Sequence, residues 1–225
     1  MEGPESTGEN LPIRFHPLLR AIALILSVVF HPLFIPLYAT LLIMASHPIQ
    51  FADFSGKARL AILGPVIENT IILPLAVVLL LKPLGFIKSL KLDTQKDRII
   101  PTVASMIFYY WLFRVSQYHS AYHEAFPPLL CSYLLGIFIA VILTFLANII
   151  MKISLHGVGM GSLVGILLLM IPDPYFNASI PLMAALLATG LVCSSRLLLS
   201  AHRGREIYVG VAVGVMAQII ATFFL

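Results

Sequence analysis

Apolar stretches of membrane-spanning length dominate this chain of 225 residues. A transmembrane helix needs about 20 predominantly apolar residues. Seven segments meet or approach that requirement, namely 21–45, 60–82, 102–118, 128–150, 156–172, 178–200 and 206–225. Hydrophobic residues make up 60% of the chain and charged residues 11%, whereas soluble domains are about 25% charged. We therefore predict an all-α, polytopic transmembrane helical bundle with six to seven spans.

The composition also suggests how the chain is divided. Residues 1–20 are polar and predict an N-terminal tail, whereas residues 21–225 predict a single transmembrane domain. No small-residue cleavage site follows the first apolar run, so we expect a retained helix rather than a cleaved signal peptide. His31-Pro32 predicts a bend in that span, because proline removes a backbone donor. Residues 83–101 mix charged and large apolar side chains, which predicts an amphipathic stretch on the membrane surface.

Charge and cysteine content argue against several kinds of partner. The net charge is only +4, and the basic residues never form a dense patch interleaved with aromatic residues. We therefore expect no nucleic-acid partner. Cys131 and Cys193 lie in apolar runs and have no metal-ligand spacing. His119 and His123 are four residues apart but lack further ligands, so we expect no metal and no cofactor.

Three polar motifs interrupt the apolar segments. In chain order they are Lys91-x6-Arg98, Ser154-x-His156 and Ser195-Arg196-x5-His202-x3-Glu206. If the chain crosses the membrane seven times, the loops after the second, fourth and sixth spans emerge on the same face. The hydropathy pattern therefore predicts that all three motifs meet at one membrane surface.

In this order and with these spacings, the motifs resemble those of the type 2 phosphatidic acid phosphatase (PAP2) superfamily. That superfamily includes lipid phosphatases and the vanadium haloperoxidases. The resemblance implies a PAP2-like helical core and hydrolysis through a phosphohistidine intermediate. By the same resemblance, His202 is the nucleophile, Glu206 holds the ring of His202, and His156 is the general acid for the leaving group.

The other motif residues are expected to bind phosphate. Lys91, Arg98 and Arg196 supply the positive charge that a phosphate needs when it leaves water. Ser154 can donate a hydroxyl hydrogen, and Leu155 can donate a backbone amide at the start of a helix, where anions are favoured. The resemblance implies that these cations take the electrostatic role that a metal has in other phosphatases.

Four positions depart from the family pattern, although every charged and proton-transfer group is present. Ile99 and Ile153 stand where the family usually has proline, Leu155 stands where it has glycine, and Glu206 stands where it has aspartate. Leucine still offers an amide, but its side chain restricts the backbone. We expect an active site that differs from the family in detail.

The predicted function is a membrane phosphatase for a lipid-linked phosphate or diphosphate. Candidate substrates are phosphatidic acid, phosphatidylglycerol phosphate and polyprenyl diphosphate, and a phosphotransferase would use the same intermediate. The alternative is a non-catalytic lipid-binding or transporter-like protein with a degenerate phosphatase site, since intramembrane charges and broken helices also mark transporters. The expected partners are a lipid phosphate and membrane lipids. The sequence leaves the oligomeric state open.

The expected location is the cell membrane, but two arguments about orientation conflict. Most of the 14 lysine and arginine residues lie on the predicted motif face, and the positive-inside rule places such a face in the cytoplasm. Bacterial lipid phosphatases that this chain resembles commonly face the other way. The sequence therefore leaves the membrane orientation of the site open.

Two charged residues fall well inside the predicted spans and outside the motifs. Glu68 lies in the second span and Arg114 in the third. Each charge alone would be costly at that depth, and pairing would remove much of the cost. We predict a buried ion pair between Glu68 and Arg114, formed directly or through a polar neighbour such as Asn69. The alternative is that Arg114 extends to the far surface and Glu68 is neutral or faces a polar cavity.

Overall fold

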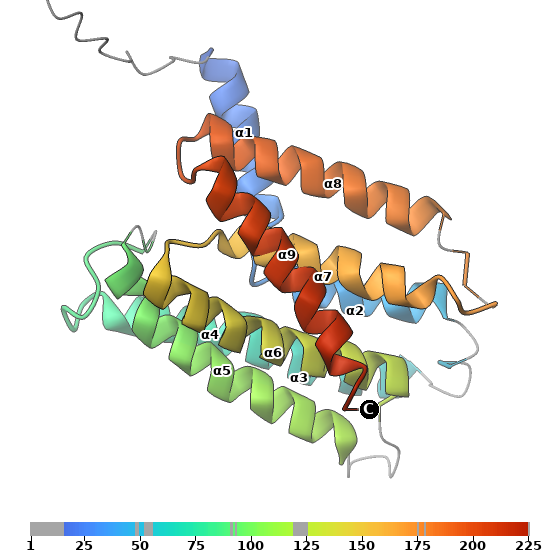
Figure 1. Ribbon diagram of the computed structural model, residues 1–225. Coiled ribbons are helices and arrows are strands. Elements are labelled where there is room, and N and C mark those ends of the chain that lie inside the picture. Colours follow the sequence, from blue (N-terminus) through green and yellow to red (C-terminus); the bar gives the residue numbers. More distant parts are fainter. Residues whose placement is uncertain are drawn as a thin grey trace, which may run out of the picture.

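The computed structural model describes residues 16–47, 50–51, 56–90, 92, 94–118, 126–174, 176–177 and 179–224. These residues form helices joined by turns and contain no strand, as predicted for an all-α fold. The helices are α1 (Pro17–Val29), α2 (Ile35–Ser46), α3 (Gly56–Ile67), the π-helical turn η1 (Glu68–Ile72), α4 (Leu73–Leu81), α5 (Gln95–Gln117), α6 (Pro128–Ile150), α7 (Leu155–Met170), α8 (Ser179–Leu198) and α9 (Gly204–Ala221). Figure 1 shows them as one elongated bundle.

Five helices are long and apolar enough to cross a membrane. They are the continuous helix formed by α3, η1 and α4 (Gly56–Leu81), and helices α5, α6, α8 and α9. Helices α1, α2 and α7 are apolar but have fewer than 18 residues each. The described residues thus form a helical membrane protein, with three shorter apolar helices beside the five long ones.

The first predicted span is divided into two helices. α1 ends at Val29 and α2 begins at Ile35. Pro32 cannot donate a backbone hydrogen bond, and the amide of Leu33 instead bonds the ring of His31 with an N···N distance of 3.4 Å. The predicted bend is confirmed, as a complete break between α1 and α2. α1 also begins at Pro17, so the last part of the predicted polar tail is helical.

The predicted surface stretch over residues 83–101 is wrong in its second half. α5 begins at Gln95, because the hydroxyl of Thr94 accepts the amide hydrogen of Asp97 at 3.1 Å and caps the helix. Residues 95–101 are therefore the first two turns of α5. Lys96, Asp97 and Arg98 therefore lie in the first turn of a helix, where Asp97 and Arg98 are buried.

Helix α7 lies at the centre of the bundle, with most of its side chains buried. It packs most closely on α9, because glycines on both helices leave no side chain between the two backbones. A Cβ atom on Gly161 would overlap the backbone of Val211, and one on Gly214 would overlap the backbone of Val158. The glycines of α7 thus form a helix-packing surface against α9.

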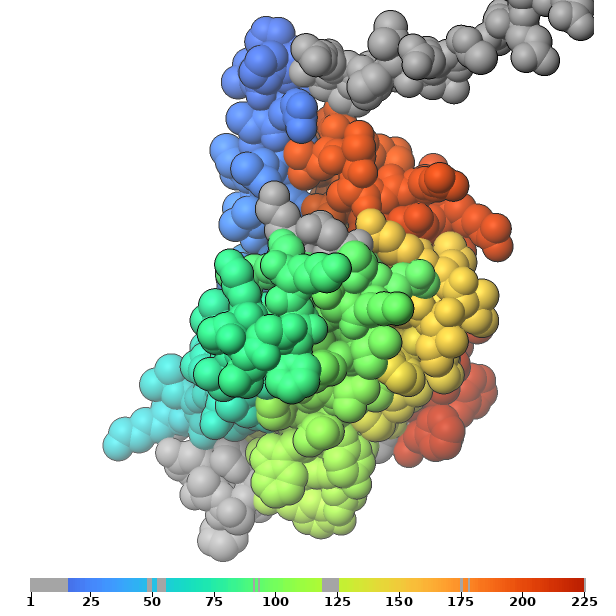
Figure 2. All heavy atoms as spheres, turned by 90° about the vertical axis from the view of Figure 1, so that its left-hand side faces the viewer, coloured from blue at the N-terminus to red at the C-terminus, as the bar shows by residue number. Residues whose placement is uncertain are grey.

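The three sequence motifs lie at the same end of the bundle. α5 and α7 begin there, α8 ends there and α9 begins there (Figure 1). Figure 2 looks onto this end: α1 and the end of α8 lie together at the top, and the start of α5 with the segment before it lies below them. The predicted convergence of the motifs on one face is confirmed for the described residues.

The predicted ion pair between Glu68 and Arg114 is wrong. Among the described residues, no ion pair joins these two side chains. Arg114 lies in the last turn of α5, where its Nη1 donates to Oε1 of Gln117 at 3.3 Å and its guanidinium lies 4.8 Å from the ring centroid of Tyr118. Its long side chain therefore reaches the end of the helix and does not need a partner within the span.

Candidate active site

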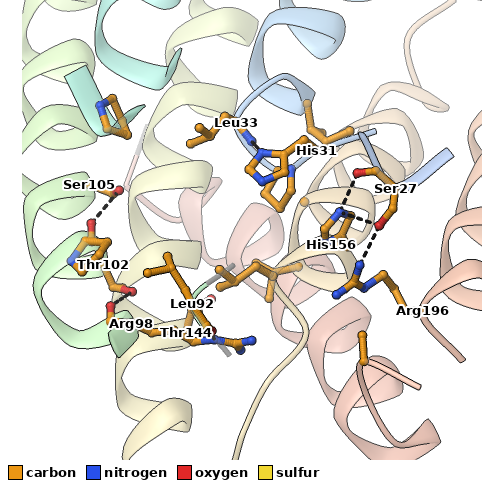
Figure 3. Close-up of a pocket in the computed structure, with 18 of the residues that line it drawn as sticks. Ser27, His31, Leu33, Leu92, Arg98, Thr102, Ser105, Thr144, His156 and Arg196 are labelled. Carbon is orange, nitrogen blue, oxygen red and sulfur yellow. Dashed lines mark hydrogen bonds between the residues drawn. The ribbon is translucent and has the colours of Figure 1, made fainter. Parts of the chain in front are cut away.

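A cavity of about 980 Å³ opens among the motif-bearing helix ends. Its polar end is lined by Arg98, Lys152, His156, Arg196 and His202. In Figure 3, His156 and Arg196 converge on one side of this cavity, and Arg98 lies across it. The structure therefore brings these five ionisable side chains, from three separate segments of the chain, to one cavity.

Arg98 lies in the first turn of α5, and its side chain is 7% exposed. Its Nε donates to the carbonyl oxygen of Leu92 at 2.8 Å, and its Nη1 donates to the carbonyl oxygen of Ile153 at 2.7 Å. Main-chain carbonyls thus fix the guanidinium without neutralising its charge. The bond to Ile153 also ties the start of α5 to the residue before the second motif.

Ser154 is the N-cap of α7 and is fully buried. Its side-chain oxygen accepts the amide hydrogen of Gly157 at 3.3 Å. Leu155 is the first helical residue and lines the cavity. Its φ is not in the left-handed region, so leucine fits this backbone without the freedom of glycine. The first amides of a helix lack intrahelical acceptors, which keeps the predicted anion-binding role of this helix start possible.

His156 is 8% exposed and contacts helix α1. Its Nε2 lies 2.9 Å from the carbonyl oxygen of Ser27 and 3.3 Å from the Ser27 hydroxyl oxygen. A carbonyl can only accept, so Nε2 carries a hydrogen. Nη1 of Arg196 donates to the same hydroxyl oxygen at 2.6 Å. One serine of α1 therefore joins the predicted general acid to a predicted phosphate-binding arginine.

His202 is placed by the way in which α8 ends. The amide of Ala201 bonds the carbonyl of Arg196, and the amide of Ser200 bonds the carbonyl of Leu197, which is the pattern of a Schellman cap. Ser200 has a φ of 52° in this cap, a conformation that usually requires glycine. The chain turns sharply there, and His202 follows between α8 and α9.

The His202 ring is held by Glu206. Nδ1 of His202 lies 2.7 Å from Oε2 of Glu206, one turn into α9. The carboxylate accepts the Nδ1 hydrogen, so the neutral ring has its lone pair on Nε2. Burial, with the charges of Arg98, Arg196 and Lys152, lowers the pKa of His202 to about 4, even though the bond to Glu206 acts in the opposite direction. His202 is therefore neutral at pH 7.

Two site residues were not predicted from the sequence. Lys152 lines the cavity, and its Nζ donates to the carbonyl oxygen of Ala201 at 3.1 Å, beside His202. The signal that could have found it is its position two residues before Ser154. Ser27 has no such signal, because it lies 129 positions before His156 and belongs to no motif.

Lys91, which was predicted to bind phosphate, lies outside the described residues. The remaining predicted residues are all at the motif end of the bundle. Five of them line the cavity: Arg98, Leu155, His156, Arg196 and His202. Ser154 and Glu206 support this wall, since the amide of Ser154 donates to the carbonyl of Glu206 at 3.1 Å.

The cavity continues from its polar end into the apolar interior. This apolar arm is lined by Leu75, Val78 and Leu79 of α4, Tyr109 of α5, and Ile137 and Val141 of α6. Tyr109 is 11 residues after Arg98, so the arm reaches roughly 16 Å below the cations along α5. Leu75 and Leu79 are half exposed on the outside of the bundle. The cavity is thus polar at the membrane surface and apolar at depth.

Within the described residues, no three His, Cys, Asp or Glu side chains come together as a metal site requires. His119 and His123 lie outside those residues. Comparison of the chain with protein-family models, with curated proteins and with solved structures finds no match.

Proposed function

We propose that this protein is a PAP2-like membrane phosphatase, with six to seven spans, that hydrolyses a lipid-linked phosphate or diphosphate. The single observation that carries the proposal is the His202–Glu206 pair at the cationic end of the cavity. A neutral imidazole with its lone pair on Nε2 is a nucleophile, and Arg98, Arg196 and Lys152 lie around it. A histidine nucleophile among three cations is suited to phosphoryl transfer.

In the first step, Nε2 of His202 attacks phosphorus, and the bond between phosphorus and the leaving oxygen breaks. Glu206 stabilises the positive charge that develops on the His202 ring as the N–P bond forms. Arg98, Arg196 and Lys152 stabilise the negative charge on the phosphoryl oxygens. The product of this step is a phosphohistidine and a leaving group that needs a proton.

His156 is the donor of that proton. The negative charge of the bound phosphate favours the protonated ring of His156, and Nε2 then passes its hydrogen to the leaving oxygen. In the second step, the neutral His156 takes a proton from water, the water oxygen attacks phosphorus, and the bond to His202 breaks. This sequence returns both histidines to their starting states and releases phosphate.

The shape of the cavity supports a lipid substrate. A phosphate headgroup would lie at the membrane surface among the cations, while its acyl or prenyl chain would lie in the apolar arm between α4, α5 and α6. A water-soluble phosphate ester would leave that arm unfilled. Phosphatidic acid, phosphatidylglycerol phosphate and polyprenyl diphosphate all meet this description.

The proposal is tested by measuring phosphate release from each of these lipids by the purified protein in mixed micelles. His202→Ala should lower release by at least about 100-fold, because it removes the nucleophile. Quenching in alkaline detergent with radiolabelled substrate should trap a phosphohistidine, which is stable in alkali, in the unchanged protein and none in the variant. His16→Ala, at an exposed position of the α1 N-cap, is the matched control.

Retention of more than a tenth of the activity by His202→Ala would exclude His202 as the sole nucleophile. Binding of these lipids by the unchanged protein without release of phosphate would favour the non-catalytic alternative.

A further inference from the structure

Ser27 presents two oxygen atoms to two groups of the proposed active site. Its hydroxyl oxygen accepts a hydrogen bond from Nη1 of Arg196 at 2.6 Å, and its carbonyl oxygen accepts one from Nε2 of His156 at 2.9 Å. Figure 3 shows Ser27 between these two side chains, on the wall of the cavity. Both donors are groups that would contact a phosphate ester during the reaction.

The Ser27 carbonyl is available because α1 breaks immediately afterwards. Ser27 lies in the last turn of α1, where carbonyls lack intrahelical partners. The amides of Phe30 and His31 bond the carbonyls of Leu26 and Val28, and Pro32 has no amide hydrogen. The sequence feature that ends α1 therefore also leaves the Ser27 oxygen free for His156.

The two Ser27 oxygens match the roles of two oxygens in the substrate. Arg196 would donate a hydrogen bond to a phosphoryl oxygen of the substrate. In this structure the Ser27 hydroxyl oxygen accepts a hydrogen bond from Arg196 in its place. His156 would donate its Nε2 hydrogen to the leaving oxygen of the substrate. In this structure the Ser27 carbonyl oxygen accepts that hydrogen in its place. We propose that Ser27 is a built-in competitor of the substrate, and that a phosphate ester binds between Arg196 and His156 by displacing α1. This inference rests on the proposed function.

Helix α1 is suited to such a movement. Its main packing partner is α8, and of its 13 residues only Ala23 and Ser27 are buried. Its other side chains are mostly exposed apolar groups, which a bilayer solvates in either position. The non-helical residues between Val29 and Ile35 provide a hinge. Besides its packing on α8, α1 is held by the Ser27 hydrogen bonds and by the hydroxyl of Tyr38, which donates to the carbonyl oxygen of Val29 at 3.0 Å at the edge of the hinge.

The first test measures the affinity of the purified full chain for inorganic phosphate by calorimetry. Ser27→Ala removes the oxygen that competes for Arg196. A hydrogen bond to a charged group contributes enough that its loss should raise phosphate affinity roughly tenfold. Ile25→Ala, an exposed position on the same helix that does not line the cavity, should leave the affinity unchanged.

The second test does not depend on the alanine variant. In Ser27→Cys, phosphate should increase the rate at which a maleimide labels position 27, measured by mass spectrometry, because α1 withdraws when the anion binds. Labelling that phosphate does not change would overturn the proposal.

The outcomes of the affinity test also separate the two hypotheses. Equal phosphate affinity of the unchanged protein and Ser27→Ala, with intact lipid hydrolysis, would overturn the role of Ser27 alone. A fall in kcat in Ser27→Ala without a gain in affinity would do the same, since it would show that Ser27 only positions His156. No phosphate binding and no hydrolysis by either protein would overturn the proposed function as well.

Discussion

The site geometry predicts that Glu206 contributes to the proposed reaction only through its hydrogen bond to His202. Nδ1 of His202 and Oε2 of Glu206 are 2.7 Å apart, and both side chains are mostly buried. In the proposed attack the His202 ring would become positive, so this hydrogen bond would be charge-assisted in the transition state. Hydrogen bonds to charged groups contribute about 1.5–3 kcal/mol, which corresponds to roughly 10- to 100-fold in rate.

We therefore expect Glu206→Gln to lower kcat by roughly 10- to 100-fold with little change in KM, because Glu206 does not line the cavity. The assay is steady-state phosphate release from phosphatidic acid in mixed micelles, combined with quenched-flow measurement of phosphohistidine formation. Glu68→Gln, which changes an exposed carboxylate of η1, serves as the control. Activity within twofold of the unchanged protein, or a loss confined to KM, would refute the assignment of Glu206 as the partner of the nucleophile.

Three further predictions follow from other parts of the structure. In the proposed mechanism only the neutral His202 ring attacks, and the pKa of His202 is lowered to about 4. The ratio kcat/KM should therefore fall as the pH drops through about 4, and an inflection assigned to His202 near 6.5 would contradict this. Gly214→Ala should destabilise the protein by about 1–3 kcal/mol in thermal unfolding, whereas Gly190→Ala, whose added Cβ meets nothing within 4 Å, should not. Ser200→Gly should stabilise it by about 1 kcal/mol, because the φ of 52° suits glycine; an unchanged or lower melting temperature would argue against backbone strain at that turn.

Hydropathy located the long helices well because their apolar runs are long and contain few charged residues. The predicted segment 128–150 coincides with α6, since neither proline nor charge interrupts it after the first turn. The segment 21–45 has the length of one span, but Pro32 divides it into two helices. Proline lacks the backbone N–H group that continues a helix, and an average of hydropathy does not detect this. The start of α5 was missed for a related reason. Thr94 and Asp97 form a helix-capping pattern, whereas the charges around them suggested a surface segment.

The candidate site was predictable as far as its residues lie in motifs. Arg98, His156 and the Arg196-x5-His202 motif are far apart in sequence, and the alternation of spans was enough to place them at one end of the bundle. Ser27 could not be predicted, because its role comes from how α1 packs on α8 and not from its neighbours in sequence. Contacts of this kind depend on the angle at which a broken helix leaves its partner, and local sequence does not specify that angle.

The relative placement of His156 and His202 is fixed by main-chain contacts, whereas Arg196 is held by a side-chain hydrogen bond to Ser27. The amide of Ser154 donates to the carbonyl of Glu206, and the glycines of α7 and α9 bring the two helix starts together. His156 and His202 are each within two residues of a helix start in this pair. Arg196 lies on α8, which has few contacts with α9. The side chain of Arg196 donates a hydrogen bond to the hydroxyl oxygen of Ser27 on α1. If α1 moves as we propose, a substrate would therefore enter beside Arg196 without disturbing the main-chain packing that places the two histidines.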